Sequence, residues 1–396
     1  MAIDLQDKLT PTKPPFWNDP RARALVFQAI VLIVVVAFLV YLIGNTLHNL
    51  ESRGISTGFD FLFNEAGFGI IQSLIEYNET STYGHTFVVG LLNTILVSAL
   101  GIVFATFLGF MIGIARLSHN WLVAKLAAVY IETFRNIPLL LQIFFWYFAV
   151  LRALPTPRQS WVFFDLAFLN IRGLYLPEPV FEQGFWLVGA GLLVAIVLVV
   201  VLKRWASRRF ETMGKPFPVF YVAIALVFGL PLLAFWLASS PLSWHIPELK
   251  GFNFRGGITV IPELTALLIA LSIYTAAFIA EIVRSGIQAV DYGQTEAAYA
   301  LGLRKNQTLR LVIIPQAMRV IIPPLTSQYL NLTKNSSLAT AIGYPDLVAV
   351  FAGTTLNQTG QAVEIIAMTM AVYLTISLLI SFFMNWYNRS VKLVER

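Results

Sequence analysis

EAAYALGLRKNQTLRLVIIP, residues 296–315, lies between two long apolar runs of this sequence. Its first six residues are mostly good helix formers. They precede Gly302, where a left-handed helix stop is inexpensive. A second helix can begin near Asn306, a good N-cap residue, and it then meets Pro315, which ends or kinks a helix. The stretch therefore predicts a short helix, a glycine turn and a second helix.

The composition places the rest of the chain in a membrane. Hydrophobic residues make up 57% of the sequence and charged residues only 12%, with a mean hydropathy of +0.73. Because soluble proteins are usually about a quarter charged, this chain has too little charge to cover a surface that faces water. The net charge of +6 does not indicate nucleic acid, since the basic residues lie at the ends of apolar runs rather than in one stripe. The absence of cysteine excludes disulfides and thiolate metal sites.

About eight runs are long and apolar enough to cross a bilayer as helices. They are residues 25–44, 87–115, 126–151, 185–202, 218–237, 261–282, 320–342 and 363–386. The seventh run is polar in its middle. Between the runs, the segments 45–86 and 152–184 are long and predict ordered loops or short helices. The sequence therefore predicts an all-α membrane protein.

The basic residues predict the orientation of these helices. Lys and Arg concentrate in cytoplasmic loops. If the chain starts inside and the spans alternate, the inner segments hold about 19 of the 27 basic residues. Omitting the seventh run would place the basic C-terminal residues outside, which supports keeping it. Both termini are therefore expected in the cytoplasm, together with residues 296–315.

The pattern in residues 296–315 resembles the EAA loop of ABC-importer permeases. That loop has Glu-Ala-Ala, three residues, Gly, nine residues, and then two apolar residues one apart followed by Pro. The matching positions are Glu296, Ala297, Ala298, Gly302, Val312, Ile314 and Pro315. Val and Ile stand where Ile and Leu are more usual. Flanking segments at 132–140, 280–287 and 331–338 resemble the branch for polar and general L-amino acids, including the glutamate/glutamine/aspartate/asparagine type.

The resemblance implies a type I ABC-importer permease fold, N-in and C-in, with a cytoplasmic coupling helix. It covers about 87–151 and 261–388. Residues 87–151 and 261–396 are expected to form the two parts of the permease core. Residues 1–86 add an N-terminal tail, a first transmembrane helix and an outer loop. Residues 152–260 add outer loops and a pair of transmembrane helices.

The expected partners follow from what the chain lacks. It has no Gly-x-x-x-x-Gly-Lys-[Ser/Thr] loop, so no cofactor is expected and a separate ATPase dimer must bind ATP and magnesium. Glu296 either complements the dipole of its helix or pairs with a basic residue of the ATPase. Since this chain has one EAA loop, a second permease copy is needed. The resemblance implies a paralogue, a periplasmic amino-acid-binding protein and a bacterial inner-membrane location.

Polar residues inside the predicted spans are candidates for the substrate path. Lys334 in the seventh run could bind an amino-acid carboxylate, or it could pair internally with Glu364 or Glu281. Glu132 and Arg135 have the spacing of a helical ion pair, which favours an interfacial pair at the cytoplasmic face. The remaining candidates are Asn331, Ser336, Ser337, Tyr274 and Gln142. The four histidines are scattered, so no metal site is expected.

The sequence thus predicts a permease subunit that imports L-amino acids and is coupled to a partner ATPase, rather than an enzyme. The alternative is a secondary transporter driven by an ion gradient. Such a transporter often has inverted repeats and needs ligands for the coupling ion. Neither feature is evident in the sequence, and this alternative gives residues 296–315 no purpose.

Overall fold

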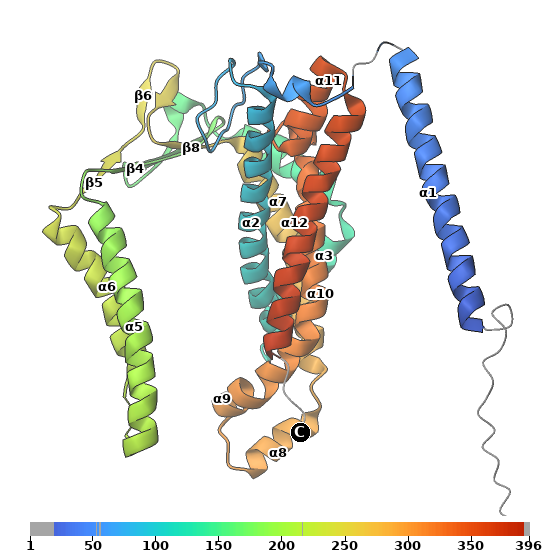
Figure 1. Cartoon of the computed structure of the whole chain (residues 1–396). Helices are drawn as coiled ribbons and strands as arrows, with labels where there is room; N and C mark the ends of the chain where they lie inside the picture. Colours follow the sequence, from blue (N-terminus) through green and yellow to red (C-terminus); the bar gives the residue numbers. More distant parts are fainter. Residues whose placement is uncertain (1–19, 53, 55–56, 216, 392–396) are drawn as a thin grey trace, which may run out of the picture. The chain divides into compact units, whose positions relative to one another are not determined.

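The computed structural model describes residues 20–52, 54, 57–215 and 217–391. Within them, seven helices are long and apolar enough to cross a membrane, and a bent helix pair raises the number to eight. All eight predicted spans therefore correspond to helical segments (Figure 1). The predicted inner segments at the two chain ends, 1–19 and 392–396, lie outside the described residues. The chain divides into two compact units, which are described separately.

The first unit contains the chain up to Leu92 together with Leu347–Ile376. Its elements are α1 (Pro20–Ser52), η1 (Asp60–Phe63), the beginning of α2 (Tyr83–Arg116), the π-helix η7 (Val348–Thr355), α11 (Leu356–Thr359) and the first part of α12 (Ala362–Val391). A small core of aromatic and aliphatic side chains includes Phe61, Phe351 and Ile365. Helices α1 and α2 extend into both ends of the predicted outer loop 45–86, and between them only η1 and one isolated β-bridge are regular in the described residues.

The second unit contains Asn93–Asp346 and Ser377–Arg396, and its core is built around α7 (Pro262–Gln288). Alanines on α7 are fully buried, and the larger Ile279 and Leu267 are buried with them. Small residues let helix backbones approach closely in membranes. The rest of α2 supplies the matching surface with Gly109 and Gly113, where an added Cβ would lie under 3.0 Å from α7 atoms.

The third span is a bent pair rather than the straight helix predicted at 126–151. α3 (Trp121–Asn136) and the segment beginning with α4 (Leu139–Phe144) meet at 105°. The chain continues through η2 (Phe145–Val150) and η3 (Leu151–Ala153). The break has a local cause, because Pro138 forces Ile137 out of the helical region, to ψ 126°.

The seventh span is longer and less regular than predicted. It runs from Lys305 to Ile342 through α9 (Lys305–Thr308), the π-helix η5 (Leu309–Ile313), α10 (Ile314–Asn335) and the 3₁₀-helix η6 (Ser336–Ile342). Pro315 was expected to end or kink the helix, and the expectation that the helix ends there is wrong. Pro315 stands in the first turn of α10, directly after the wide π turn, and the helix continues past it.

Segments 161–181 and 242–260 form strands. They are β1 (Trp161–Phe163), β2 (Ala167–Asn170), β3 (Gly173–Leu176), β4 (Glu178–Phe181), β5 (Leu242–His245), β6 (Glu248–Lys250), β7 (Asn253–Arg255) and β8 (Ile258–Val260). β1, β2, β3 and β8 make an antiparallel sheet, while β4–β5 and β6–β7 are antiparallel pairs. Within the segment 152–184, ordered loops or short helices were expected, and residues 161–181 form strands instead. Runs of aromatic and β-branched residues between short turns favour strands instead.

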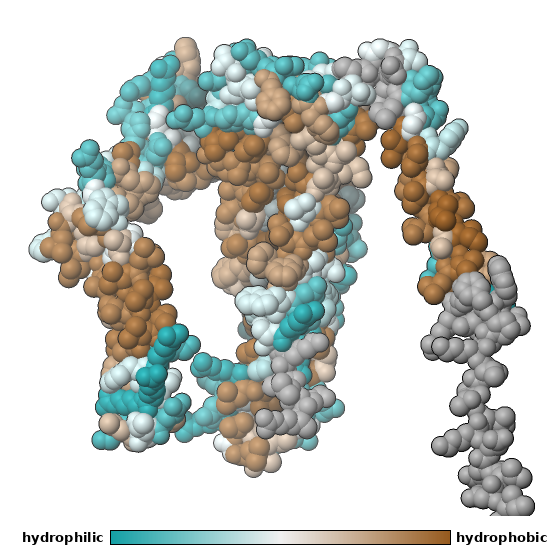
Figure 2. Space-filling view, in the orientation of Figure 1, coloured by the Kyte–Doolittle hydropathy of each residue, from teal (hydrophilic) through white to brown (hydrophobic). Residues whose placement is uncertain are grey.

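These strands flank the helices α5 (Trp186–Met213) and α6 (Val219–Leu237), which pack against each other. Gly191 of α5 makes room for this contact, because an added Cβ would lie 3.2 Å from the Leu230 carbonyl oxygen. Figure 2 shows hydrophobic residues over the middle of this pair and hydrophilic residues at its lower end. The pair therefore has the surface expected of a lipid-facing helical hairpin.

Candidate functional site

The stretch 296–315 folds as a capped helix followed by a turn. α8 (Tyr292–Ala300) begins after Asp291, whose Oδ1 accepts a hydrogen bond from the Gly293 N–H at 2.7 Å. At the other end Gly302 has φ +77°. The Gly302 N–H donates to the Tyr299 carbonyl and the Leu303 N–H to the Ala298 carbonyl, at 2.9 and 3.1 Å. This pair of bonds is the Schellman motif, so the predicted glycine turn is confirmed.

The second helix starts earlier than expected. Its N-cap is Arg304, not Asn306, and the Arg304 N–H donates to Gln307 Oε1 at 3.0 Å. Because the helix already begins at Lys305, Asn306 lies inside its first turn. A further bond from Gln316 Nε2 to Gln294 Oε1 at 3.2 Å joins α10 to α8.

α8 exposes most of its surface. Ala298 is 3% exposed and is its one buried residue, whereas Leu301 is 82% and Tyr292 72% exposed. Glu296 and Ala297 are exposed as well. Large apolar side chains that project from a capped short helix are typical of a surface that binds another protein.

Glu296 does not complement the start of its helix. α8 begins at Tyr292, so Glu296 lies in the middle of the helix and no acidic residue occupies the first turn. Dipole stabilisation falls off beyond the first turn, and the expectation based on it is wrong. No ion pair involves Glu296 within the described part of the chain.

Of the residues predicted to line the substrate path at the seventh span, some are exposed and the others are hydrogen-bonded to the backbone. Lys334 and Asn331 are exposed on α10. By contrast, Ser336 Oγ donates to the Thr333 carbonyl and Ser337 Oγ to the Lys334 carbonyl, both at 2.7 Å. The two serines are therefore occupied by their own helix.

The internal partners proposed for Lys334 are engaged elsewhere. Glu281 forms an ion pair with Arg284, and Glu364 Oε1 accepts from the Gly58 N–H at 2.7 Å. Among the described residues, the ion pairs do not include Lys334. The internal-pair alternative thus has no support in this chain.

The side chain of Gln142 stabilises the bend in the third span by hydrogen bonds to the backbone. Its side chain is 4% exposed, and Nε2 donates to the carbonyls of Phe134 and Ile137, both at 3.0 Å. These carbonyls lose helical partners because Pro138 has no N–H and interrupts the helix. Gln142 therefore has a structural role that spacing alone did not indicate.

The other predicted residues lie near this bend without forming one site. Glu132 is exposed, and the expected ion pair between Glu132 and Arg135 is not found among the described residues. The Arg135 guanidinium lies instead 5.3 Å from the ring centroid of Phe278. Tyr274 is half-buried and packs on Phe278, with centroids 5.0 Å apart. A packing role accounts for Tyr274.

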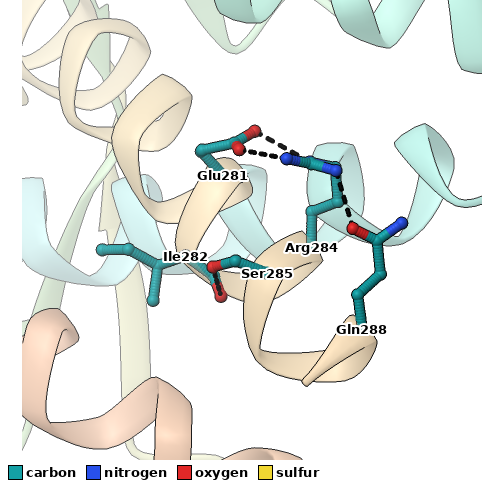
Figure 3. A network of polar contacts seen from close by, with 5 residues as sticks. All are labelled: Glu281, Ile282, Arg284, Ser285 and Gln288. Carbon is teal, nitrogen blue, oxygen red and sulfur yellow. Dashed lines mark hydrogen bonds and ion pairs between the residues drawn. The ribbon is translucent and has the colours of Figure 1, made fainter. Parts of the chain in front are cut away.

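A polar network at the end of α7 was missed (Figure 3). Arg284 Nε donates to Glu281 Oε2 at 3.0 Å, and its Nη1 donates to Gln288 Oε1 at 2.7 Å. The signal was present in the sequence, because residues three and four apart share a helix face. No group of acidic or histidine residues in the described chain could hold a metal ion.

Comparisons with known proteins identify the family of the chain. Residues 101–393 match the family described as binding-protein-dependent transport system inner membrane component. The chain is 61% identical to the putative amino-acid ABC transporter permease protein YhdX of Escherichia coli (strain K12), over 96% of each chain. It is 53% identical to the general L-amino acid transport system permease protein AapQ of Rhizobium johnstonii, over 96% of this chain and 94% of that one. It is 45% identical to the glutamate/glutamine/aspartate/asparagine transport system permease protein BztB of Rhodobacter capsulatus, over 96% of each chain.

Proposed function

The chain belongs to the family of binding-protein-dependent transport inner membrane components, and from this premise we propose that it carries L-amino acids across the inner membrane. It is a multi-pass permease subunit of an ABC importer. The permeases AapQ and BztB carry names for general L-amino acids and for glutamate, glutamine, aspartate and asparagine. Since the likeness to them runs along nearly the whole chain, a broad range of L-amino acids is the substrate class that we propose.

The exposed surface of α8 carries the proposal for coupling. A capped helix with exposed Tyr292, Tyr299 and Leu301 fits a groove of a partner. The partner is an ATPase that binds ATP and magnesium. Movement of the ATPases shifts α8, and α8 transmits the shift to α10 through the turn at Gly302. For this to drive transport, the ATPase must bind the two states of the permease with different affinity.

The orientation of the chain is part of the proposal. Basic residues concentrate in the segments that would be inside if both termini are cytoplasmic. α8 then faces the cytoplasm, where the ATPase is, and the strands of 161–181 and 242–260 face the periplasm. A second permease chain completes the importer, and we propose that it is a paralogue.

Lys334 is the proposed contact for the substrate carboxylate. It lies on a membrane-spanning helix, is exposed in the single chain, and has no ion-pair partner among the described residues. A basic side chain in a span is expensive unless it is paired or hydrated. A water-filled path between two permease chains, with an amino-acid carboxylate passing through it, satisfies that need. Asn331, one helical turn away, would hydrogen-bond the same substrate.

Single-cysteine labelling tests the orientation and the ATPase contact together. The chain contains no cysteine, so Tyr299→Cys and Asn253→Cys each create one label site. With a membrane-impermeant maleimide added from the periplasmic side, we expect Asn253→Cys to be labelled and Tyr299→Cys to stay unlabelled. In isolated membranes, Tyr299→Cys should cross-link to the ATPase. Labelling of Tyr299→Cys from the periplasmic side would refute the proposal.

The role of Lys334 needs its own measurement. Lys334→Ala should lower uptake or change the pattern of competition among L-amino acids, while Lys334→Arg keeps the charge and retains most of the uptake. Ser337→Ala is the matched control, since its hydroxyl is bound to its own helix. Normal uptake and an unchanged competition pattern in Lys334→Ala would remove Lys334 from the path.

A further inference from the structure

The inserted helical hairpin ends in a strongly basic segment. Between Lys203 and Lys215 the sequence has five basic residues and one acidic residue, Glu211. α5 has 28 residues, which at about 1.5 Å each span about 42 Å, whereas the hydrocarbon core is only about 30 Å thick. The last turns of α5 therefore extend from the hydrocarbon into the headgroup layer.

The basic residues of this segment form no ion pair with any residue that the structure describes. The ion pairs of the described residues involve His245, Lys250 and Arg284 as the cationic groups, and none involves the basic end of α5. Arg209 lies over the ring of Trp205, 5.2 Å from its centroid. Figure 2 shows the change from hydrophobic to hydrophilic surface at this end of the helix pair. The segment thus presents uncompensated positive charge next to an apolar, lipid-facing surface.

A groove between the two helices lies at the same level. It has a volume of about 390 Å³ and is lined by Lys203, Ala206, Ser207, Phe210, Phe217 and Val219. On α5 the positions 203, 207 and 210 share one helix face. The groove therefore combines an ammonium group and a hydroxyl with two aromatic rings. Above it, on the same face of α5, the exposed Ile196 and Val200 continue an apolar surface.

We infer that this groove binds an anionic phospholipid. The phosphate accepts hydrogen bonds from Lys203 and Ser207, and the remaining basic residues of the segment attract the negative headgroup. The acyl chains follow the apolar surface of α5 into the bilayer. Charge complementarity and continuity with the lipid-facing surface favour a lipid over an acidic protein, which would have no use for the apolar part. The inference does not depend on the transported substrate or on the ATPase contact.

Native mass spectrometry of the purified, assembled importer tests this site. The complex is taken from nanodiscs that contain phosphatidylglycerol or phosphatidylcholine, and the retained lipids are counted. We expect preferential retention of phosphatidylglycerol, and an apparent affinity at least fivefold weaker in Lys203→Gln with Ser207→Ala. Lys203→Arg should keep the affinity. Arg389→Gln, which removes one exposed positive charge from the end of α12, is the matched control and should behave as the unmodified chain.

Several results would overturn the inference. Equal retention of the two lipids would mean that the groove does not distinguish an anionic from a zwitterionic headgroup. Unchanged phosphatidylglycerol affinity in the Lys203→Gln, Ser207→Ala variant would place the lipid elsewhere. Displacement of the lipid by millimolar glycerol phosphate would identify a site for soluble phosphates instead. Displacement by polyglutamate without loss of activity would identify a surface for acidic proteins.

Discussion

Replacing Gly109 by alanine tests whether the close approach of α2 and α7 stabilises the second unit. A Cβ atom at position 109 would lie 2.6 Å from both Cβ and Cγ2 of Ile279 and 3.1 Å from the carbonyl oxygen of Ala276. Since carbon atoms in contact are about 3.5–4.0 Å apart, the two helices must separate by about 1 Å. Overpacking of this kind costs about 1–3 kcal/mol.

Alanine also has a favourable effect that the control must remove. It is the better helix former by about 1 kcal/mol. Gly229 of α6 has no heavy atom within 4 Å of the position of an added Cβ. Gly229→Ala therefore gains helix propensity without the steric clash that a Cβ causes at position 109. We therefore expect Gly109→Ala to be less stable than Gly229→Ala by about 1–3 kcal/mol, which corresponds to a melting temperature ~2–6 °C lower.

Thermal unfolding of the purified chain in detergent measures this difference. The two variants are compared at the same protein and detergent concentration, because melting temperatures are comparable only when the solution conditions are held fixed. Gly109→Leu should accumulate poorly in membranes, whereas Gly229→Leu should accumulate normally. A Gly109→Ala chain that melts at or above the temperature of Gly229→Ala would show that the helices can separate without loss, and the reasoning would fail.

Two further predictions concern the candidate site. Gly302→Ala should reduce transport per ATP hydrolysed, because a left-handed conformation costs a residue with a Cβ about 1–2 kcal/mol, while Gly302→Asn should reduce it less. The ratio of uptake to phosphate release in proteoliposomes measures this effect. Equal ratios in both variants would count against a need for this turn. Gln142→Leu should destabilise the chain by about 1–3 kcal/mol, because two part-buried carbonyls lose their donor. Gln358→Leu, which removes the part-buried hydrogen bond from Tyr83, is the comparison, and an unchanged melting temperature for Gln142→Leu would contradict its role at the bend.

The membrane helices could be predicted because a span needs only a sustained apolar run, which any window of about 20 residues reveals. The turn at Gly302 was predictable for a similar reason, since glycine adopts positive φ at low cost. Both features depend on local sequence. The bend in the third span also has a local cause, Pro138, but its angle of 105° depends on the packing of α4 against α7.

The parts that were not predicted depend on non-local contacts. The strands of the insertion pair across a helical hairpin, as β3 does with β8 and β4 with β5, so no single window contains both partners. Gln142 resembles any polar residue in a span until the carbonyls that it satisfies are seen. The expected Glu132–Arg135 pair failed because Arg135 lies over the Phe278 ring, on another helix.

The caps of α8 have a consequence for assembly. Asp291 and the two hydrogen bonds at Gly302 complete the ends of this helix within the chain itself, so the segment is preorganised before any nucleotide-binding subunit arrives. Docking then requires no disorder-to-order transition, and little of the free energy of binding is lost to ordering this segment. Subunits could dissociate and rebind without refolding the permease, and α8 should keep its helical conformation in an isolated permease.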